Sequence, residues 1–150
     1  MEVNNTSRSN NAANAARCFR QAATLISNTE LLSLPKREPL MVIPFVVNAS
    51  FACELYLKAL AYRSDVGLTG HSLSKLLANL PQGERQNLDR AWASLNNQVI
   101  HSVASMELVI HALSNCFESW RYSYEKERVT APDSSSIFDL LEALDIAYWY

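Results

Sequence analysis

Four polar side chains have the types that acid–base chemistry or anion binding requires: Glu54, Lys58, His71 and Arg121. A histidine ring exchanges a proton near neutral pH, and a lysine or an arginine stabilises the negative charge that develops in a transition state. The four residues are spread over nearly half of the chain. They can act together only if the fold brings them into one cleft, so the elements that carry them decide their role.

Glu54 and Lys58 stand four residues apart with the acid first, which is the favourable order for an ion pair on a helix. The surrounding segment is largely apolar. The pair therefore either stabilises the edge of a helical bundle or lines a cleft with other polar groups, and the structural interpretation is the commoner one for a pair of this kind.

His71 follows Gly70 in a turn before a short helical segment, where its ring can cap the helix or carry a proton. Arg121 lies among aromatic residues. Its guanidinium can stack against a nucleic-acid base, or it can pair with Glu118 or Glu125 while its stem covers apolar surface. For both residues the sequence leaves a structural and a functional role open.

The sequence holds no motif for a metal or a cofactor, and we expect neither. His101 and His111 are ten residues apart, whereas two histidines that share a metal on one helix stand four apart. Cys18, Cys53 and Cys116 form no Cys-x-x-Cys pair. This spacing indicates reduced, buried thiols rather than disulfides or a zinc site.

The chain has 150 residues, of which 49% are apolar, 19% are charged and only three are glycine. This balance favours one compact helical domain. The net charge of −2 gives no overall basic field for nucleic acid. We expect a cytoplasmic protein, because the polar N-terminus lacks the apolar core of a signal peptide. The apolar run 39–47 is soon interrupted by polar residues, which indicates a core helix rather than a membrane span.

Apolar residues recur three and four positions apart, and no alternating strand pattern of useful length is present. We therefore predict an all-α, single-domain, up-and-down bundle of five or six helices over residues 11–150, after a polar arm over residues 1–10. We expect a first helix from residue 11 to residue 28 or 32, and a second from residue 39 or 44 to residue 62. A third should cover 73–80, and a fourth and a fifth should run through 88–99 and 103–124. The last should cover 137–148, with Ser136 and Asp139 as a capping box.

The fifth of these helices carries an apolar seam over three heptads, formed by Val103, Met106, Ile110, Leu113, Phe117, Trp120 and Tyr124. Such a seam fills either the core of one chain or an interface between two chains. The last four residues, Ala147-Tyr148-Trp149-Tyr150, are mostly aromatic, and aromatic side chains favour burial. We predict a homodimer, with a filled single core as the alternative.

Three stretches together resemble the HEPN superfamily of small helical-bundle proteins: residues 48–60, residues 70–73 with Leu76 and Leu77, and residues 117–122. The similarity covers roughly residues 17–128. It implies a helical bundle, frequent homodimerisation, and a role in prokaryotic defence, toxin–antitoxin pairs or RNA processing. Many members are metal-independent ribonucleases with an arginine followed, after four to six residues, by a histidine. This chain departs from that pattern, since seven residues separate Arg63 from His71.

These observations favour a HEPN-like binding or accessory module of an RNA-directed, defence or toxin–antitoxin system, with RNA or a partner protein as its ligand. The alternative is a metal-independent endoribonuclease in which His71 exchanges a proton with the 2′-hydroxyl or the leaving oxygen, and Lys58 or Arg121 stabilises the charged phosphorane. A third possibility is a structural, antitoxin-like partner. Convergence of His71, Glu54, Lys58 and Arg121 in one cleft would favour catalysis or ligand binding.

Overall fold

The computed structural model describes residues 4–32, 42–96, 105–120 and 133–150. Within these ranges the chain forms no β-strand, and the prediction of an all-α bundle is confirmed. The described residues form six helices: α1 (Asn5–Leu32), α2 (Val42–Arg63), α3 (Leu73–Ala78), α4 (Gln82–Asn96), α5 (Met106–Trp120) and α6 (Ser134–Trp149).

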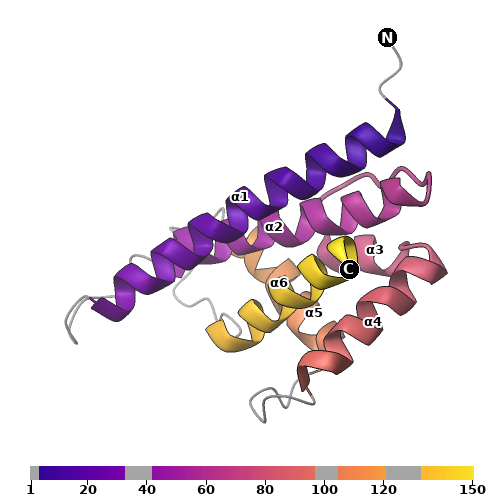
Figure 1. The fold of residues 1–150 in the computed structure, drawn as a ribbon. Helices are drawn as coiled ribbons and strands as arrows, with labels where there is room; N and C mark the ends of the chain where they lie inside the picture. The colour runs from indigo at the N-terminus through magenta and orange to yellow at the C-terminus, as the bar shows by residue number, and fades with distance from the viewer. Residues whose placement is uncertain (1–3, 33–41, 97–104, 121–132) are drawn as a thin grey trace.

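The central helix of the bundle is α2 (Figure 1). α1 runs antiparallel to α2 along one side, while α3, α5 and α6 pack against α2 elsewhere on its surface. α4 packs mainly on α6. A helix that meets neighbours on several faces must be apolar around most of its circumference, which explains why the pattern of α2 is so broadly hydrophobic.

The segment Ile43–Arg63 is long and apolar enough to cross a membrane by length and composition alone. In the fold, however, 61% of its most hydropathic window is buried. Its buried side chains belong to the same core as those of α3, α5 and α6. This burial agrees with the interpretation of the segment as a core helix.

α1 begins earlier than predicted, because the expected polar arm contributes its first turns. The backbone N–H of Thr6 donates to Asn4 Oδ1 (3.1 Å) where the helix starts at Asn5. Ser9 is buried, and its hydroxyl donates to the carbonyl oxygen of Ala59 on α2 (2.8 Å). The polar composition of this segment does not predict the contact, since Ala59 lies 50 residues away from Ser9 in the sequence.

α6 also begins earlier than predicted, at Ser134. Its N-cap is Asp133, whose carboxylate accepts hydrogen bonds from the backbone N–H groups of Ser135 and Ser136. Ser136 therefore lies inside the first turn, and the predicted capping box of Ser136 and Asp139 is wrong. Asp133 is the N-cap instead of Ser136, because its carboxylate accepts hydrogen bonds from two backbone N–H groups.

The described part of the fifth-helix seam is buried within the chain, as the positions of Met106, Ile110 and Leu113 show. The other members of the seam, or their side chains, lie outside the described residues. At the end of α6 the ring of Tyr148 is buried, whereas Tyr150 is 96% exposed. The described seam thus contributes to the core of one chain, and the homodimer stays a prediction.

Two of the three cysteine side chains are described, and their surroundings differ. Cys53 is buried in the core, and this burial raises the pKa of its thiol. Cys18 is a free, exposed thiol on α1, so the prediction of a buried thiol is wrong for this residue. The physical reason is that α1 packs chiefly against α2, which leaves its opposite face in water. The side chain of Cys116 lies outside the described residues.

Candidate functional site

Glu54 and Lys58 lie one turn apart on α2, and both side chains are largely covered. The Glu54 side chain is 7% exposed and the Lys58 side chain 16% exposed. The Lys58 ammonium donates to Glu54 Oε1 over 2.7 Å. A charge buried in a bundle is costly without a partner, so the lysine compensates the carboxylate.

The turn that carries His71 starts where α2 ends. The N–H of Val66 donates to the carbonyl oxygen of Ala61 (2.9 Å), as in a Schellman motif. Asp65 takes the left-handed conformation that this motif requires, with φ of 58°. Gly70 has φ of 89°, which side chains other than glycine rarely adopt. These two positions redirect the chain and place His71 against α2.

His71 reaches back to Glu54. Its Nδ1 lies 3.0 and 3.1 Å from the two carboxylate oxygens. When Nδ1 donates to the carboxylate, Nε2 carries the lone pair and can accept a proton. The side chain is 71% exposed, and Nε2 has no hydrogen-bond partner among the described residues. The contact therefore fixes the orientation of the ring and leaves its second nitrogen open to a ligand.

Two serines extend this site toward neighbouring helices. Ser72 is the N-cap of α3, where its hydroxyl accepts a hydrogen bond from the N–H of Lys75 (3.5 Å). The same hydroxyl lies 3.5 Å from the hydroxyl of Ser114 on α5. α3 ends at Ala78, two residues before the predicted end. The sequence offered no signal for Ser114, because nothing in its neighbourhood indicates which helix it will face.

Ser50 lies one turn before Glu54 on the same side of α2. It is 2% exposed, and its hydroxyl has no hydrogen-bond partner in the described structure. A buried hydroxyl without a partner costs free energy. The sequence analysis missed this residue, although a serine four positions before the candidate acid is a visible signal.

The fold thus brings three of the four candidate residues together: Glu54, Lys58 and His71. Arg121 lies outside the described residues. The charges of Glu54 and Lys58 balance each other, so the described site has no net positive charge while His71 is neutral. Among the described residues, no group of three histidine, cysteine, aspartate or glutamate side chains could hold a metal ion.

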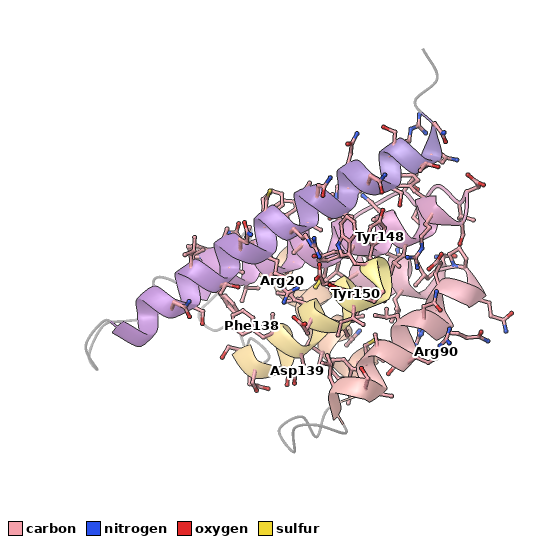
Figure 2. The ribbon with its side chains drawn as sticks, in the orientation of Figure 1. Arg20, Arg90, Phe138, Asp139, Tyr148 and Tyr150 are labelled. Atoms are coloured by element: carbon pink, nitrogen blue, oxygen red, sulfur yellow. The ribbon has the colours of Figure 1, made fainter. Side chains whose placement is uncertain are left out.

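A second polar cluster joins α1, α2 and α6 around Asp145, and Figure 2 shows Arg20 at this junction. The Asp145 carboxylate accepts hydrogen bonds from Arg17 Nε (2.9 Å) and the Tyr56 hydroxyl (2.5 Å), and Arg20 Nη1 lies 3.2 Å away. Burial alone would raise the pKa of Asp145, but these donors and charges outweigh it, and the pKa lies below its ordinary value. Burial and the bond to Asp145 raise the pKa of Tyr56. The cluster ties α6 to α1 and α2 through a carboxylate that is mostly buried, while the side chain of Arg17 is 43% exposed.

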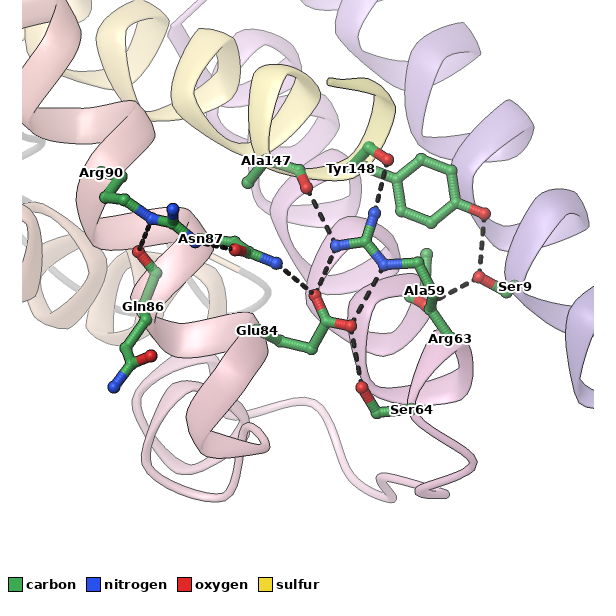
Figure 3. A network of polar contacts seen from close by, with 10 residues as sticks. All are labelled: Ser9, Ala59, Arg63, Ser64, Glu84, Gln86, Asn87, Arg90, Ala147 and Tyr148. Carbon is green, nitrogen blue, oxygen red and sulfur yellow. Dashed lines mark hydrogen bonds and ion pairs between the residues drawn. The ribbon is translucent and has the colours of Figure 1, made fainter.

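A third cluster, centred on Arg63, joins α2, α4 and α6 (Figure 3). Its Nη1 and Nη2 donate to the carbonyl oxygens of Tyr148 (2.6 Å) and Ala147 (3.0 Å), groups that the end of a helix leaves unpaired. Its Nε donates to Glu84 Oε1 over 3.1 Å. Burial alone would raise the pKa of Glu84, but hydrogen bonds from Arg63 and Ser64 outweigh it and lower the pKa. This arginine fastens the end of α6 to the bundle.

The sequence analysis singled out neither of these two clusters. Asp145 did carry a signal, since an acid inside the apolar stripe of the last helix requires a partner. Arg63 carried none, because its partners lie 21, 84 and 85 residues away. Such contacts depend on the complete packing of the helices.

No family model, no curated protein and no solved structure matches this chain. The resemblance to the HEPN superfamily accordingly rests on the three stretches of sequence named above. What the fold adds is coarser: an all-α bundle of six helices over the described residues.

Proposed function

We propose that the protein is a HEPN-like helical module that binds RNA or a partner protein. Its role would be that of an accessory component of a prokaryotic RNA-directed, defence or toxin–antitoxin system, without RNA cleavage by the isolated chain. The sequence resemblance and the six-helix bundle support this proposal. The observation that carries it is the ion pair inside the candidate site, where Lys58 Nζ lies 2.7 Å from Glu54 Oε1.

Cleavage of RNA without a metal requires positive groups that stabilise the charge on the phosphorane. Lys58 is poorly suited to that task, because only 16% of its side chain is exposed and Glu54 already balances its charge. Separating this pair to bind a phosphate would leave the buried carboxylate without its lysine. The pairing therefore favours a structural task for Glu54 and Lys58, and an accessory task for the protein.

The test is an assay of RNA binding and cleavage with the purified protein, a single-stranded RNA and a hairpin RNA in the presence of EDTA. We expect no cleavage products above those of a protein-free control. Metal-independent cleavage that disappears in His71→Ala, but persists in the control variant His111→Ala, would overturn this expectation. It would promote the second candidate function.

That second candidate is a metal-independent endoribonuclease, and the exposure of His71 favours it. With Nδ1 held by Glu54, Nε2 would take the proton of the 2′-hydroxyl. The 2′-oxygen would attack phosphorus, and the bond to the 5′-oxygen would break as that oxygen takes up a proton from water. The products would be a 2′,3′-cyclic phosphate and a 5′-hydroxyl. Arg121 or Lys58 would stabilise the phosphorane.

Activity and stability together separate the two candidates. In a nuclease, His71→Ala abolishes cleavage and leaves the melting temperature nearly unchanged, because the ring acts in the transition state rather than in folding. In an accessory module there is little activity to lose. The larger effect is then a loss of stability when Glu54 is replaced and its buried partner is left unpaired.

A homodimer is part of the proposal, on the strength of the HEPN resemblance. Light scattering at micromolar concentration measures the mass directly, and we expect twice the mass of one chain. The mass of a single chain would contradict the proposed dimer, while leaving the binding role to its own test.

A further inference from the structure

His71 holds one ring nitrogen against the protein and presents the other to solvent. Its Nδ1 lies 3.0 and 3.1 Å from the two carboxylate oxygens of Glu54. The Glu54 side chain is 7% exposed, whereas that of His71 is 71% exposed. The two nitrogens point in different directions from an imidazole ring, so Nε2 is not the one that faces the buried acid. A small molecule can therefore reach Nε2 from solvent while the helices stay in place.

The contact with Glu54 favours Nε2 as a nucleophile. While Nδ1 keeps its proton in the hydrogen bond to Glu54, the lone pair of the ring lies on Nε2. Attack by Nε2 on an electrophile places positive charge on the ring, and the carboxylate lies against the nitrogen that shares this charge. A charge that develops beside a fixed opposite charge lowers the barrier to the reaction. Histidine is one of the side chains that form covalent intermediates in this way.

The charges around His71 favour an anionic electrophile. Lys58 Nζ lies 2.7 Å from Glu54 Oε1, so an anion that approaches the ring does not meet an unbalanced carboxylate. Lys75 on α3 adds a positive charge four residues after His71, and in the part of the chain that the structure describes no carboxylate pairs with it. A phosphoryl group is a compact electrophile that carries negative charge. It needs one accessible nitrogen and no further protein ligand.

We propose that Nε2 of His71 is a phosphorylation site, which takes its phosphoryl group from a small donor of the phosphoramidate or acyl phosphate class. The lone pair of Nε2 forms the bond to phosphorus. The bond from phosphorus to the leaving group breaks, and its electron pair goes to that group. Nδ1 keeps its proton in the hydrogen bond to Glu54, and the product is an Nε2-phosphohistidine. The phosphoryl group would occupy the nitrogen that exchanges protons, so modification would stop any proton transfer by His71.

The experiment treats the full chain with phosphoramidate at neutral pH, without RNA or added metal. N-acetylhistidine in the same solution is the internal reference, because it has the same ring without the fold. Peptide mass spectrometry locates the phosphoryl group, and phosphorus NMR distinguishes attachment at Nε2 from attachment at Nδ1. Brief acid treatment separates phosphohistidine, whose bond from phosphorus to nitrogen hydrolyses, from an acid-stable phosphate ester on Ser72 or Ser114.

Two variants and one change of conditions test the source of the reactivity. His71→Gln removes the acceptor, and His111→Gln is its control because it removes an exposed histidine from α5. Glu54→Gln keeps the size of the side chain and removes its charge. Since this last change also weakens the fold, the wild-type chain unfolded in urea provides a second test of the same contact. Circular dichroism checks that each variant keeps its helices.

We expect Nε2 of His71 to react at least about tenfold faster than N-acetylhistidine, because the bond to the carboxylate stabilises the charged ring. The modification should be absent from His71→Gln, unchanged in His111→Gln and slower by at least about tenfold in Glu54→Gln. In urea, His71 should react at the rate of the reference. Equal rates in the folded chain, attachment at Nδ1, or a preference that persists in urea would overturn the proposal. The reaction contains no RNA and no partner protein, so its outcome is independent of the proposed function.

Discussion

The Asp145 cluster and the Glu54 site both hold a carboxylate inside the bundle, with side-chain exposures of 12% and 7%. Their partners differ. Asp145 is surrounded by two arginines and a tyrosine hydroxyl that burial makes a weaker acid. Glu54 is paired with one lysine and with a histidine ring that is 71% exposed. Among the partners of Asp145, Tyr56 is fully buried and the side chains of Arg20 and Arg17 are 27% and 43% exposed, so all are less exposed than His71.

This difference teaches that the burial of an acid does not reveal its role, but the exposure of its partners does. A substitution at Asp145 should chiefly change the stability of the fold, because the described partners all bind that one carboxylate. The more exposed His71 can exchange a proton or meet a ligand while the bundle stays folded. Substitutions at the two carboxylates and at His71 can therefore sharpen the comparison or break it.

The largest effect is expected for Asp145→Asn. This change removes the acceptor that balances Arg17 and Arg20 and weakens the bond from Tyr56, so we expect a loss of about 4 kcal/mol of unfolding free energy in urea. The control is Glu142→Gln, which breaks the ion pair to Arg20 at a residue that is 43% exposed. It should cost less than about 1 kcal/mol. Equal losses would mean that Asp145 contributes no more to stability than an exposed ion pair does.

The next largest effect is expected for Glu54→Gln. The buried Lys58 would lose its partner, and the unfolding free energy should fall by about 3 kcal/mol. Asp89→Asn is a matched control, because Asp89 and Arg85 form the same type of pair one turn apart on an exposed face. That variant should lose less than about 0.5 kcal/mol. A loss at Glu54 no larger than this would indicate a site held ready for a ligand rather than for stability.

Acid should affect the Asp145 and Arg63 clusters in a defined direction. The pKa values of Asp145 and Glu84 lie below their ordinary values of 3.8 and 4.5. Folding therefore favours their ionised forms, and this contribution is complete above those ordinary values and is lost as the pH falls through the lowered pKa values. Thermal melts from pH 6 downward should show a fall in Tm that begins near pH 4 to 5. The fall should be shallower in Asp145→Asn, and an equally steep fall would contradict the assignment.

The smallest effect is expected for His71→Ala. Because the ring is mostly in water, its removal should change the unfolding free energy by less than about 1 kcal/mol. Urea denaturation measures this change, with the exposed Lys75→Ala on α3 as the control. A loss as large as that of Glu54→Gln would show that the contact of His71 with Glu54 is structural, and the contrast between the two clusters would then disappear.

Much of the fold could be predicted from the sequence, because it follows from local periodicity. Ile137, Leu140, Leu141 and Leu144 recur at helical spacing, and all four are buried in α6. The ion pair of Glu54 and Lys58 is equally local, since four residues make one turn of a helix. Helix starts were less predictable. They depend on single capping contacts, such as that of Asp133, which several nearby polar residues could have made.

The contacts between distant segments could not be predicted, since they depend on how the helices pack. The approach of His71 to Glu54 requires both the left-handed Asp65 and the positive φ of Gly70, and a short apolar pattern fixes neither. The Asp145 cluster needs partners 89 and 128 residues earlier in the chain. Periodicity says which face of a helix is buried, but not which residue on another helix it meets.

The place of α6 in the chain has a consequence for synthesis on the ribosome. Groups on α6 bind to Ser9, Arg17, Tyr56 and Arg63. These four residues lie 84 to 139 positions earlier in the chain than the groups that they bind, so they are synthesised first. At a usual rate of about 5 to 20 residues per second, these polar groups stay hydrated for several seconds before α6 emerges. The hydrogen bonds that join α6 to α1 and α2 therefore form only after α6 has been made. A ribosome stalled before α6 would hold a partly open bundle, which is the kind of surface that chaperones and proteases recognise.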